Sequence, residues 1–289
     1  MLKGTLVALV TPFKDGKVDL AALERLVDWH IEQGTDGLVP VGTTGESPTV
    51  NMDEHKNIIQ TVIKQAGGRV PVIAGTGGNA TAEAIELTRF AKDAGADASL
   101  QVCPYYNKPT QEGLYQHFGA IADACDLPMV LYNIPGRTGI TMTADTVARL
   151  AERDQVVAIK EATGSMDQTS DILSRCDLTV LSGDDSLTLP LMALGAQGVI
   201  SVVANLVPQD VKRLTDAMLA GDVRTACAAH RHLYPLCRAM FVETNPIPIK
   251  TAMMWAGLLV SDEKRLPLTD LSPAAADTLR VVMTDYGLL

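Results

Sequence analysis

The chain has 289 residues, 47% of them hydrophobic, which is enough for one large core, either in a single barrel of about 250 residues with an appendage or in two domains. A formal net charge of -10 argues against nucleic acid or an anionic membrane surface as partners, because both need basic patches, and no segment approaches the roughly 20 apolar residues that span a bilayer. The five cysteines are an odd number without CxxC spacing, so they predict neither a disulfide framework nor a zinc site, and we expect reduced thiols in a cytoplasmic protein.

Short apolar runs rich in β-branched residues recur along the chain, and each predicts a buried strand. These runs cover residues 6–10, 37–41, 70–74, 98–102, 129–132, 156–159, 178–181 and 199–203. Stretches with helical spacing lie between them, at residues 19–33, 52–65, 80–94, 111–124, 144–153, 168–174, 186–194 and 209–219. Strand then helix, repeated about eight times without a hairpin signal, predicts an α/β fold of the (β/α)8 TIM-barrel type, and Asp19 is the expected N-cap of the first helix.

The main alternative fold is a doubly wound sheet that binds a dinucleotide. Residues 75–80 match GxGxxA between a strand and a helix, which is a weak signal for such a sheet. The acidic residue that should follow about 20 positions later is missing, because the next strand runs into Cys103 and Pro104. We therefore assign these glycines to a tight loop of the barrel.

The strand pattern stops after Gly221, and helical patterns follow at residues 223–241, 246–259 and 272–286. This change predicts a catalytic barrel over residues 1–221 and a helical appendage over residues 222–289. The appendage is expected to cover barrel surface or to build part of a subunit contact.

The sixth predicted strand ends in Lys160, so its amine should emerge at the carboxyl end of the barrel, where barrel enzymes keep their chemistry. An amine at the mouth of an apolar barrel is poorly solvated, which disfavours the ammonium form and leaves a nucleophile for a carbonyl carbon. Taken alone, Lys160 fits a surface or ion-paired lysine better than a Schiff-base lysine. The neighbouring loops favour the Schiff base.

Polar residues follow several other predicted strands. Residues 42–47 place two glycines around Thr43 and Thr44, so backbone N–H groups could turn toward a small carboxylate, although a flexible turn with Ser47 or Thr49 capping the next helix fits this loop equally well. Tyr105 and Tyr106 form a pair in the loop after the fourth strand, in a chain with only 4% aromatic residues. Such tyrosines suit the walls of a site.

Tyr132 ends the fifth strand, which should neighbour the sixth, so Tyr132 and Lys160 should emerge side by side. A phenol beside a nucleophilic amine can donate and recover the protons that imine formation moves. Arg137 follows in the same loop and offers a planar fork for a carboxylate. Asp184 and Asp185 could bind a divalent ion, but two acids ahead of a helix more often cap it, so no metal site is expected.

With these stretches in place, the chain resembles the dihydrodipicolinate (4-hydroxy-tetrahydrodipicolinate) synthase family, within the pyruvate-dependent class I aldolases that include N-acetylneuraminate lyase. The resemblance runs essentially end to end. It rests on GTTGES at 42–47, PYYNKP at 104–109, YNIPGRTG at 132–139, IKEATG at 159–164, LSGDD at 181–185, GVISV at 198–202 and NPIPIK at 245–250.

The resemblance implies condensation of pyruvate with L-aspartate 4-semialdehyde, in lysine and diaminopimelate biosynthesis, without a metal or an organic cofactor. It implies that Lys160 forms the imine with pyruvate and that Thr43, Tyr106 and Tyr132 relay protons, with Tyr106 reaching into a neighbouring subunit's site. Thr44 would help to hold the pyruvate carboxylate. The remaining substrate contacts would come from Arg137 and from backbone groups of Gly183 and Ile200. A homo-oligomer is implied, commonly a tetramer built as a dimer of dimers.

Some members of the family are inhibited by L-lysine at a subunit interface. The matching positions keep much of the polarity of that site: Ser47, His55, Asn79, Glu83 and Tyr105. Met52 departs from the histidine of some sensitive members, and Pro48 replaces a small residue. These residues leave open whether L-lysine inhibits this chain.

Two other functions remain open from the sequence. The closer one is another pyruvate-imine aldolase, such as a lyase for N-acetylneuraminate or a 2-keto-3-deoxy sugar acid, and Arg137 argues against it because a sugar would need hydroxyl partners there. The second is a non-catalytic barrel that acts as a regulator or binding module. The joint presence of Lys160, Tyr132, Thr43 and Tyr106 argues against that function.

Overall fold

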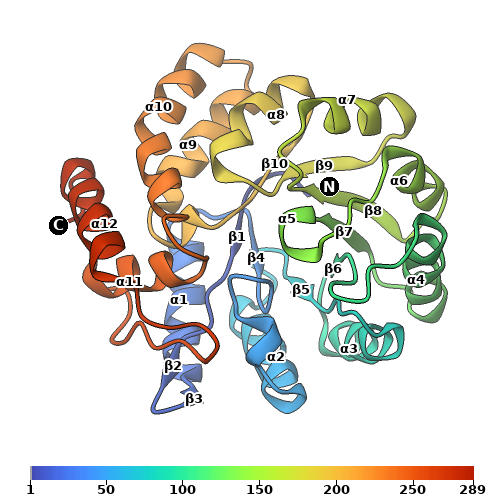
Figure 1. Cartoon of the computed structure of the whole chain (residues 1–289), viewed down its shortest axis with the longest axis horizontal. Coiled ribbons are helices and arrows are strands. Elements are labelled where there is room, and N and C mark those ends of the chain that lie inside the picture. The colour runs from blue at the N-terminus through green and yellow to red at the C-terminus, as the bar shows by residue number, and fades with distance from the viewer. Residues whose placement is uncertain (1) are drawn as a thin grey trace.

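The structure, a computed structural model, describes residues 2–289. Its centre is a sheet of eight parallel strands in the order β4-β1-β10-β9-β8-β7-β6-β5, and a bridge from Leu38 to Val72 connects the two ends of this order. The strands are β1 (Gly4–Ala8), β4 (Gly37–Val39), β5 (Ile73–Gly75), β6 (Ala98–Val102), β7 (Met129–Asn133), β8 (Val156–Glu161), β9 (Thr179–Ser182) and β10 (Gly198–Ser201). Figure 1 looks down this ring, with the helices around it. The predicted (β/α)8 barrel is confirmed.

The helices around the ring follow the strands one by one: the first seven lead from one strand to the next, and the eighth leads from the last strand into the C-terminal region. They are α1 (Leu20–Glu32), α2 (Met52–Ala66), α3 (Thr81–Ala94), α4 (Gln111–Ala124), α6 (Ala144–Ala151), α7 (Met166–Arg175), α8 (Thr188–Leu194) and α9 (Pro208–Leu219). Shorter turns of helix occur in the loops: η1 (Ser47–Thr49), α5 (Pro135–Thr138), η2 (Asp185–Leu187) and η3 (Val203–Asn205).

The strands are buried on both faces, which explains why their sequences are continuous apolar runs. Successive side chains of a strand point to opposite faces. In β8, Ala158 belongs to the apolar cluster inside the ring and Ile159 to the cluster between the ring and the helices. Lys160 therefore follows Ala158 toward the inside of the barrel.

Local signals at the helix starts explain several boundaries. Asp19 caps α1 as predicted, because its carboxylate accepts a hydrogen bond from the Ala22 N–H at 2.9 Å. Helix α2 is capped by Asn51, which forms a capping box with Glu54. Ser47 and Thr49, the other caps considered, lie in η1 instead.

Three features differ from the expected pattern. Residues 13–18 form an antiparallel hairpin of β2 (Phe13–Lys14) and β3 (Lys17–Val18), although no hairpin was expected. Its turn is Asp15-Gly16, with φ of 53° and 76°, which is the left-handed pair that a tight hairpin turn requires. Strand β10 also ends before the expected residue 203, because the Val202 and Val203 N–H groups donate to Asp185 rather than to a neighbouring strand. The helix expected from residue 246 to 259 ends sooner, as α11 (Ile247–Trp255).

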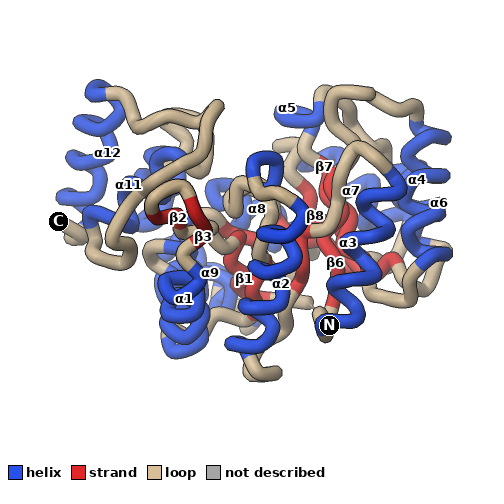
Figure 2. Tube along the Cα trace, turned by 90° about the horizontal axis from the view of Figure 1, so that it is seen from below, coloured by secondary structure: helices blue, strands red, loops and turns tan. Residues whose placement is uncertain are grey.

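The chain beyond residue 221 is helical, as expected, and consists of α10 (Val223–Ala239), α11 (Ile247–Trp255) and α12 (Pro273–Tyr286). Helix α10 packs against α9, and α12 packs against α10 and α11. Figure 2 shows α11 and α12 at one side of the barrel, near α1 and the β2–β3 hairpin. Within residues 2–289, no helix combines the length and apolar character needed to cross a bilayer.

Candidate active site

Lys160 and Tyr132 are paired neighbours at the carboxyl ends of β8 and β7. The Lys160 Nζ lies 4.3 Å from the centroid of the Tyr132 ring. Both residues are almost completely buried, with 4% of each exposed. The expectation that these two side chains emerge side by side is confirmed, and the pairing places a phenol ring against the Lys160 amine.

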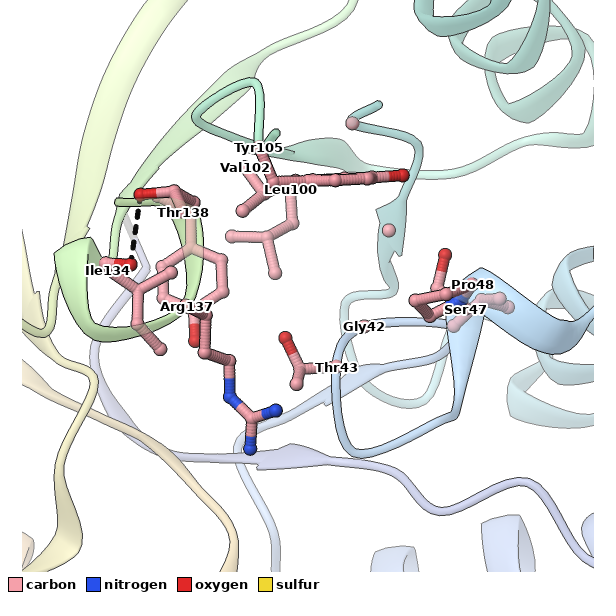
Figure 3. Close-up of a pocket in the computed structure, with 14 residues that line it drawn as sticks. Gly42, Thr43, Ser47, Pro48, Leu100, Val102, Tyr105, Ile134, Arg137 and Thr138 are labelled. Atoms are coloured by element: carbon pink, nitrogen blue, oxygen red, sulfur yellow. Dashed lines mark hydrogen bonds between the residues drawn. The ribbon is translucent and has the colours of Figure 1, made fainter. Parts of the chain in front are cut away.

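A cavity of about 250 Å³ opens beside Tyr132. Its polar lining includes Thr43, Ser47, Tyr105 and Arg137, which come from the loops after β4, β6 and β7. Figure 3 shows these four side chains around one open space. The volume suits a small substrate, and the polar groups converge on it from several loops, as in barrel enzymes.

Gly183 lies directly against Lys160. A methyl group built onto Gly183 would lie 3.2 Å from the Lys160 Cε and 2.6 Å from the Ala162 Cβ, so no side chain fits at this position. The Gly183 N–H donates to the Glu161 carbonyl at 2.8 Å. Gly183 therefore shapes the space for the lysine, and it is not among the residues that line the cavity.

Ile200, the other expected backbone contact, is fully buried in the apolar cluster inside the barrel. It is also absent from the lining of the cavity. Next to Gly183, burial raises the pKa of the Asp184 carboxyl, and the nearby positive charge of Lys160 opposes this effect. Asp184 therefore lies near enough to Lys160 for the lysine charge to act on its carboxyl.

The loop that carries Thr43 and Thr44 is joined to the opposite side of the site by Asn245. The Asn245 side-chain amide donates to the Thr44 Oγ1 at 3.0 Å, and the Asn245 carbonyl accepts from the Arg137 Nη2 at 2.9 Å. The Thr44 hydroxyl keeps its own proton for another acceptor. No role was predicted for Asn245, although it begins the NPIPIK motif, because a contact across 201 residues leaves no local pattern.

Tyr106 lies outside this cavity. The structure leaves 91% of it exposed, and its backbone is left-handed with a φ of 72°. A single chain therefore does not bring Tyr106 to Tyr132 and Thr43. Tyr106 lines a second hollow instead, together with Lys108 and Arg137.

The five positions of the expected lysine site gather on the α2 and α3 side of the cavity. Ser47 and Tyr105 line it, and the Asn79 side chain donates to the Tyr105 carbonyl at 3.3 Å. The His55 ring lies 2.6 Å from the Gly75 carbonyl, and burial lowers the pKa of this histidine. Burial raises the pKa of the Tyr105 hydroxyl, and the charge of Glu83 adds to the effect.

The two acids after β9 do not cap the helix that follows. Asp185 is buried, and its carboxylate accepts hydrogen bonds from the Ser201 hydroxyl and from the Val202 and Val203 N–H groups. Asp184 precedes η2 without a capping bond from its side chain. In the described part of the chain, residues 2–289, no three His, Cys, Asp or Glu side chains gather in a way that could hold a metal ion.

Comparison with known proteins shows close relatives along the whole chain. The model of the dihydrodipicolinate synthetase family matches residues 1–285. A protein of Pelobacter propionicus named 4-hydroxy-tetrahydrodipicolinate synthase is 58% identical over 291 residues, and one of the same name from Geobacter sulfurreducens is 56% identical over 291 residues. In both comparisons all of this chain and all of the relative are covered.

Solved structures of dihydrodipicolinate synthases are also similar to this chain over essentially its whole length. The dihydrodipicolinate synthase of Aquifex aeolicus has a TM-score of 0.98 at 51% identity and covers 99% of each chain. The chloride-inhibited enzyme of Acinetobacter baumannii, complexed with pyruvate, has a TM-score of 0.97 at 48% identity over 100% of both chains. The enzyme of Cyanidioschyzon merolae with lysine bound has a TM-score of 0.96 at 44% identity over 99% of both chains. The chain therefore belongs to the dihydrodipicolinate synthetase family.

Proposed function

We propose that this protein condenses pyruvate with L-aspartate 4-semialdehyde to give 4-hydroxy-tetrahydrodipicolinate, as a Schiff-base lyase of lysine and diaminopimelate biosynthesis. The observation that carries the proposal is the Lys160 amine held 4.3 Å from the Tyr132 ring centroid, at the mouth of the barrel. The names of the relatives that match this chain over its full length support it.

The chemistry begins when the Lys160 amine attacks the keto carbon of pyruvate and water leaves. The protonated imine then draws electrons from the pyruvate methyl group, which loses a proton and gives an enamine. The enamine attacks the aldehyde carbon of the second substrate. The substrate amine finally displaces Lys160 and closes the ring. Tyr132, Thr43 and Tyr106 are the groups that we assign to the proton transfers, and a positioned acid or base of this kind is worth about 10²–10⁴ in rate.

The two substrate carboxylates have separate partners in this proposal. Thr43 and Thr44 hold the carboxylate of pyruvate, and Arg137 holds that of the semialdehyde, because a guanidinium binds a carboxylate through two parallel hydrogen bonds. We also propose substrate contacts from backbone groups of Gly183 and Ile200, although neither residue lines the cavity itself. The pyruvate complex of the Acinetobacter baumannii enzyme supports pyruvate as the first substrate.

An assay with competing substrates tests the reaction. The protein should consume pyruvate with L-aspartate 4-semialdehyde and should leave N-acetylneuraminate and 2-keto-3-deoxy sugar acids intact. Preferential cleavage of a sugar acid would establish the aldolase alternative instead. If the protein binds pyruvate but consumes neither the pyruvate–semialdehyde pair nor a sugar acid, the result would favour the non-catalytic barrel.

The proposal includes a homo-oligomer, as a tetramer made of two dimers, in the cytoplasm. Exposure of Tyr106 supports a contact between subunits, because a left-handed, 91% exposed tyrosine has few partners within its own chain. The catalytic barrel spans residues 1–221 and the helical region residues 222–289.

L-Lysine is the proposed feedback inhibitor. The grouping of Ser47, His55, Asn79, Glu83 and Tyr105 beside the cavity supports a site for it, and so does the lysine-bound relative from Cyanidioschyzon merolae. The rate of condensation, titrated with L-lysine, should fall. A flat response at millimolar L-lysine would exclude this inhibition.

A further inference from the structure

A buried ion pair lies directly behind the loop that carries Thr43 and Thr44. Glu46 belongs to this loop, Lys250 belongs to α11, and the distance from the Lys250 Nζ to the Glu46 Oε1 is 2.7 Å. The Lys250 side chain is 0% exposed and the Glu46 side chain is 1% exposed. The pair is therefore fully removed from water and joins parts of the chain that are 204 residues apart.

All donors and acceptors of the pair are occupied by groups that surround the loop. The Lys250 Nζ also donates to the Thr11 carbonyl at 2.9 Å and to the Glu263 carbonyl at 2.5 Å. The second oxygen of Glu46 accepts from the Arg265 N–H at 3.0 Å. Three ammonium donors and both carboxylate oxygens are thus satisfied, which is the condition for a buried pair to hold one defined geometry.

Glu46 needs such support because its backbone is strained. Its φ is 57° and its ψ is 35°. These angles lie in the left-handed region, where any residue that carries a Cβ has a higher free energy. In this conformation the Glu46 N–H donates to the Thr43 carbonyl at 3.1 Å, which closes the turn around Thr43 and Thr44. The Thr11 hydroxyl, from the loop after β1, holds the same turn through the Gly45 carbonyl at 2.7 Å.

Burial of two charges does not by itself explain the pair as a source of stability. Replacing a buried ion pair by neutral residues of similar volume is often neutral or stabilising for a fold. A pair that fixes a left-handed residue beside two substrate-binding threonines serves to define the structure of the loop rather than to add stability. It selects one conformation of the loop.

We infer that Glu46 and Lys250 are positioning residues, which hold the Thr43–Thr44 loop in the conformation that receives the pyruvate carboxylate. The inference rests on the proposed function, because it takes the roles of Thr43 and Thr44 from it. Neither Glu46 nor Lys250 touches the substrate in this account. The C-terminal region thereby acts on the chemistry of the barrel through the shape of one loop.

The test compares Lys250→Met with the double variant Glu46→Gln/Lys250→Met. The single variant leaves a buried carboxylate without its charge partner and should lower the melting temperature strongly. The double variant has no unpaired charge, so its melting temperature should recover. Its kcat/KM for pyruvate should nevertheless stay low by about 100-fold, mainly through KM, because a small displacement of a binding group has an effect of that size.

Two controls separate positioning from general damage. Lys212→Met breaks an ion pair with Asp36, which lies just ahead of β4 at the opposite end of the barrel, and it should lower stability without changing the KM for pyruvate. Amide hydrogen exchange should become faster at residues 42–49 of the double variant and remain unchanged in β9. A double variant that folds and keeps its KM for pyruvate within about twofold of the unaltered protein would overturn the inference.

The outcome also distinguishes this inference from the function on which it rests. If borohydride fails to trap pyruvate on the unaltered protein, the proposed function is wrong. If trapping succeeds and the double variant behaves like the unaltered protein, only the positioning role of Glu46 and Lys250 is wrong.

Discussion

At the scale of single residues, the site depends on which face of a strand a side chain occupies. Lys160 and Tyr132 point into the barrel because they alternate with outward-facing Ile159 and Leu131. Glu161, on the opposite face from Lys160, accepts hydrogen bonds from the Thr163 N–H at 2.8 Å and from the Asn133 side chain at 3.3 Å. The Lys160 amine lies against the Tyr132 ring, 4.3 Å from its centroid, where we propose that it meets the substrate carbonyl.

The absence of a side chain at Gly183 leads to the first prediction. Gly183→Ala would add a methyl group 2.6 Å from the Ala162 Cβ, 3.1 Å from the Glu161 carbonyl and 3.2 Å from the Lys160 Cε, so the chain beside the lysine must shift. We expect imine formation with pyruvate to slow by about 100-fold. The rate of borohydride-trapped adduct formation, measured by mass spectrometry, checks this.

The matched control is Gly78→Ala. No atom lies within 4 Å of a methyl group at Gly78, which also lies in a loop after a strand. This variant should form the adduct at the original rate. Equal rates for the Gly183 and Gly78 variants would show that space beside Lys160 does not limit the reaction.

At the scale of elements, the C-terminal segment is fastened to the barrel by Arg265. Its guanidinium donates to both oxygens of Glu54 at 2.6 Å, and to the Thr49 carbonyl at 2.9 Å. These bonds hold the pKa of the Glu54 carboxyl below its ordinary value of 4.5. A carboxyl with a depressed pKa stabilises the fold above 4.5, and the stabilisation is lost as the pH falls through the lower, folded pKa.

Glu54→Gln should therefore remove stability at neutral pH and flatten the acid dependence. We expect a loss of about 2 kcal/mol in the free energy of unfolding at pH 7, as for other hydrogen bonds to charged groups. The difference from the unaltered protein should shrink as the pH falls below 4.5, and urea unfolding at several pH values measures it.

Glu86→Gln is the control for this prediction. Glu86 pairs with Lys56 at 2.7 Å, but 56% of its side chain is exposed, so its loss should cost less than about 1 kcal/mol. If the loss in the free energy of unfolding of Glu54→Gln stayed constant over about four pH units, from pH 7 to pH 3, the stabilisation would not come from the depressed pKa of Glu54.

The sequence predicts most elements because the barrel strands are buried on both faces and their helices are amphipathic. It misses the β2–β3 hairpin, whose strands have two residues each and whose Asp15-Gly16 turn is the only signal. Loops after strands predict Lys160, Tyr132, Thr43 and Arg137 as neighbours, because the carboxyl ends of parallel strands meet. Asn245 and Lys250 could not be predicted, since their contacts with Thr44 and Glu46 depend on how the C-terminal helices pack onto the barrel.

At the scale of the whole molecule, the site in one chain lacks a residue that the proposed mechanism uses. Tyr106 is exposed and lies outside the cavity of its own chain. In a two-fold symmetric dimer, one surface loop can reach the equivalent site of the other subunit. Each active site would then combine Lys160 of one subunit with Tyr106 of its partner.

Mixing two inactive variants tests this exchange. Lys160→Ala and Tyr106→Phe, expressed together, form mixed dimers with one site that has both Lys160 and Tyr106. Random pairing gives about a quarter of the original activity, because half of the dimers are mixed and half of their sites are complete. Activity no higher than that of Tyr106→Phe alone would show that Tyr106 does not act across the interface.

The proposed reaction depends above all on a covalent bond between Lys160 and pyruvate. Intact-mass analysis after treatment with pyruvate and borohydride, followed by peptide mapping, tests it most directly. We expect one reduced adduct per chain, located on Lys160 and absent from Lys160→Ala, while a Lys92→Ala variant, altered at the end of α3, is labelled normally. An adduct that persists in Lys160→Ala, or that maps to another lysine in the unaltered protein, would show that Lys160 is not the nucleophile.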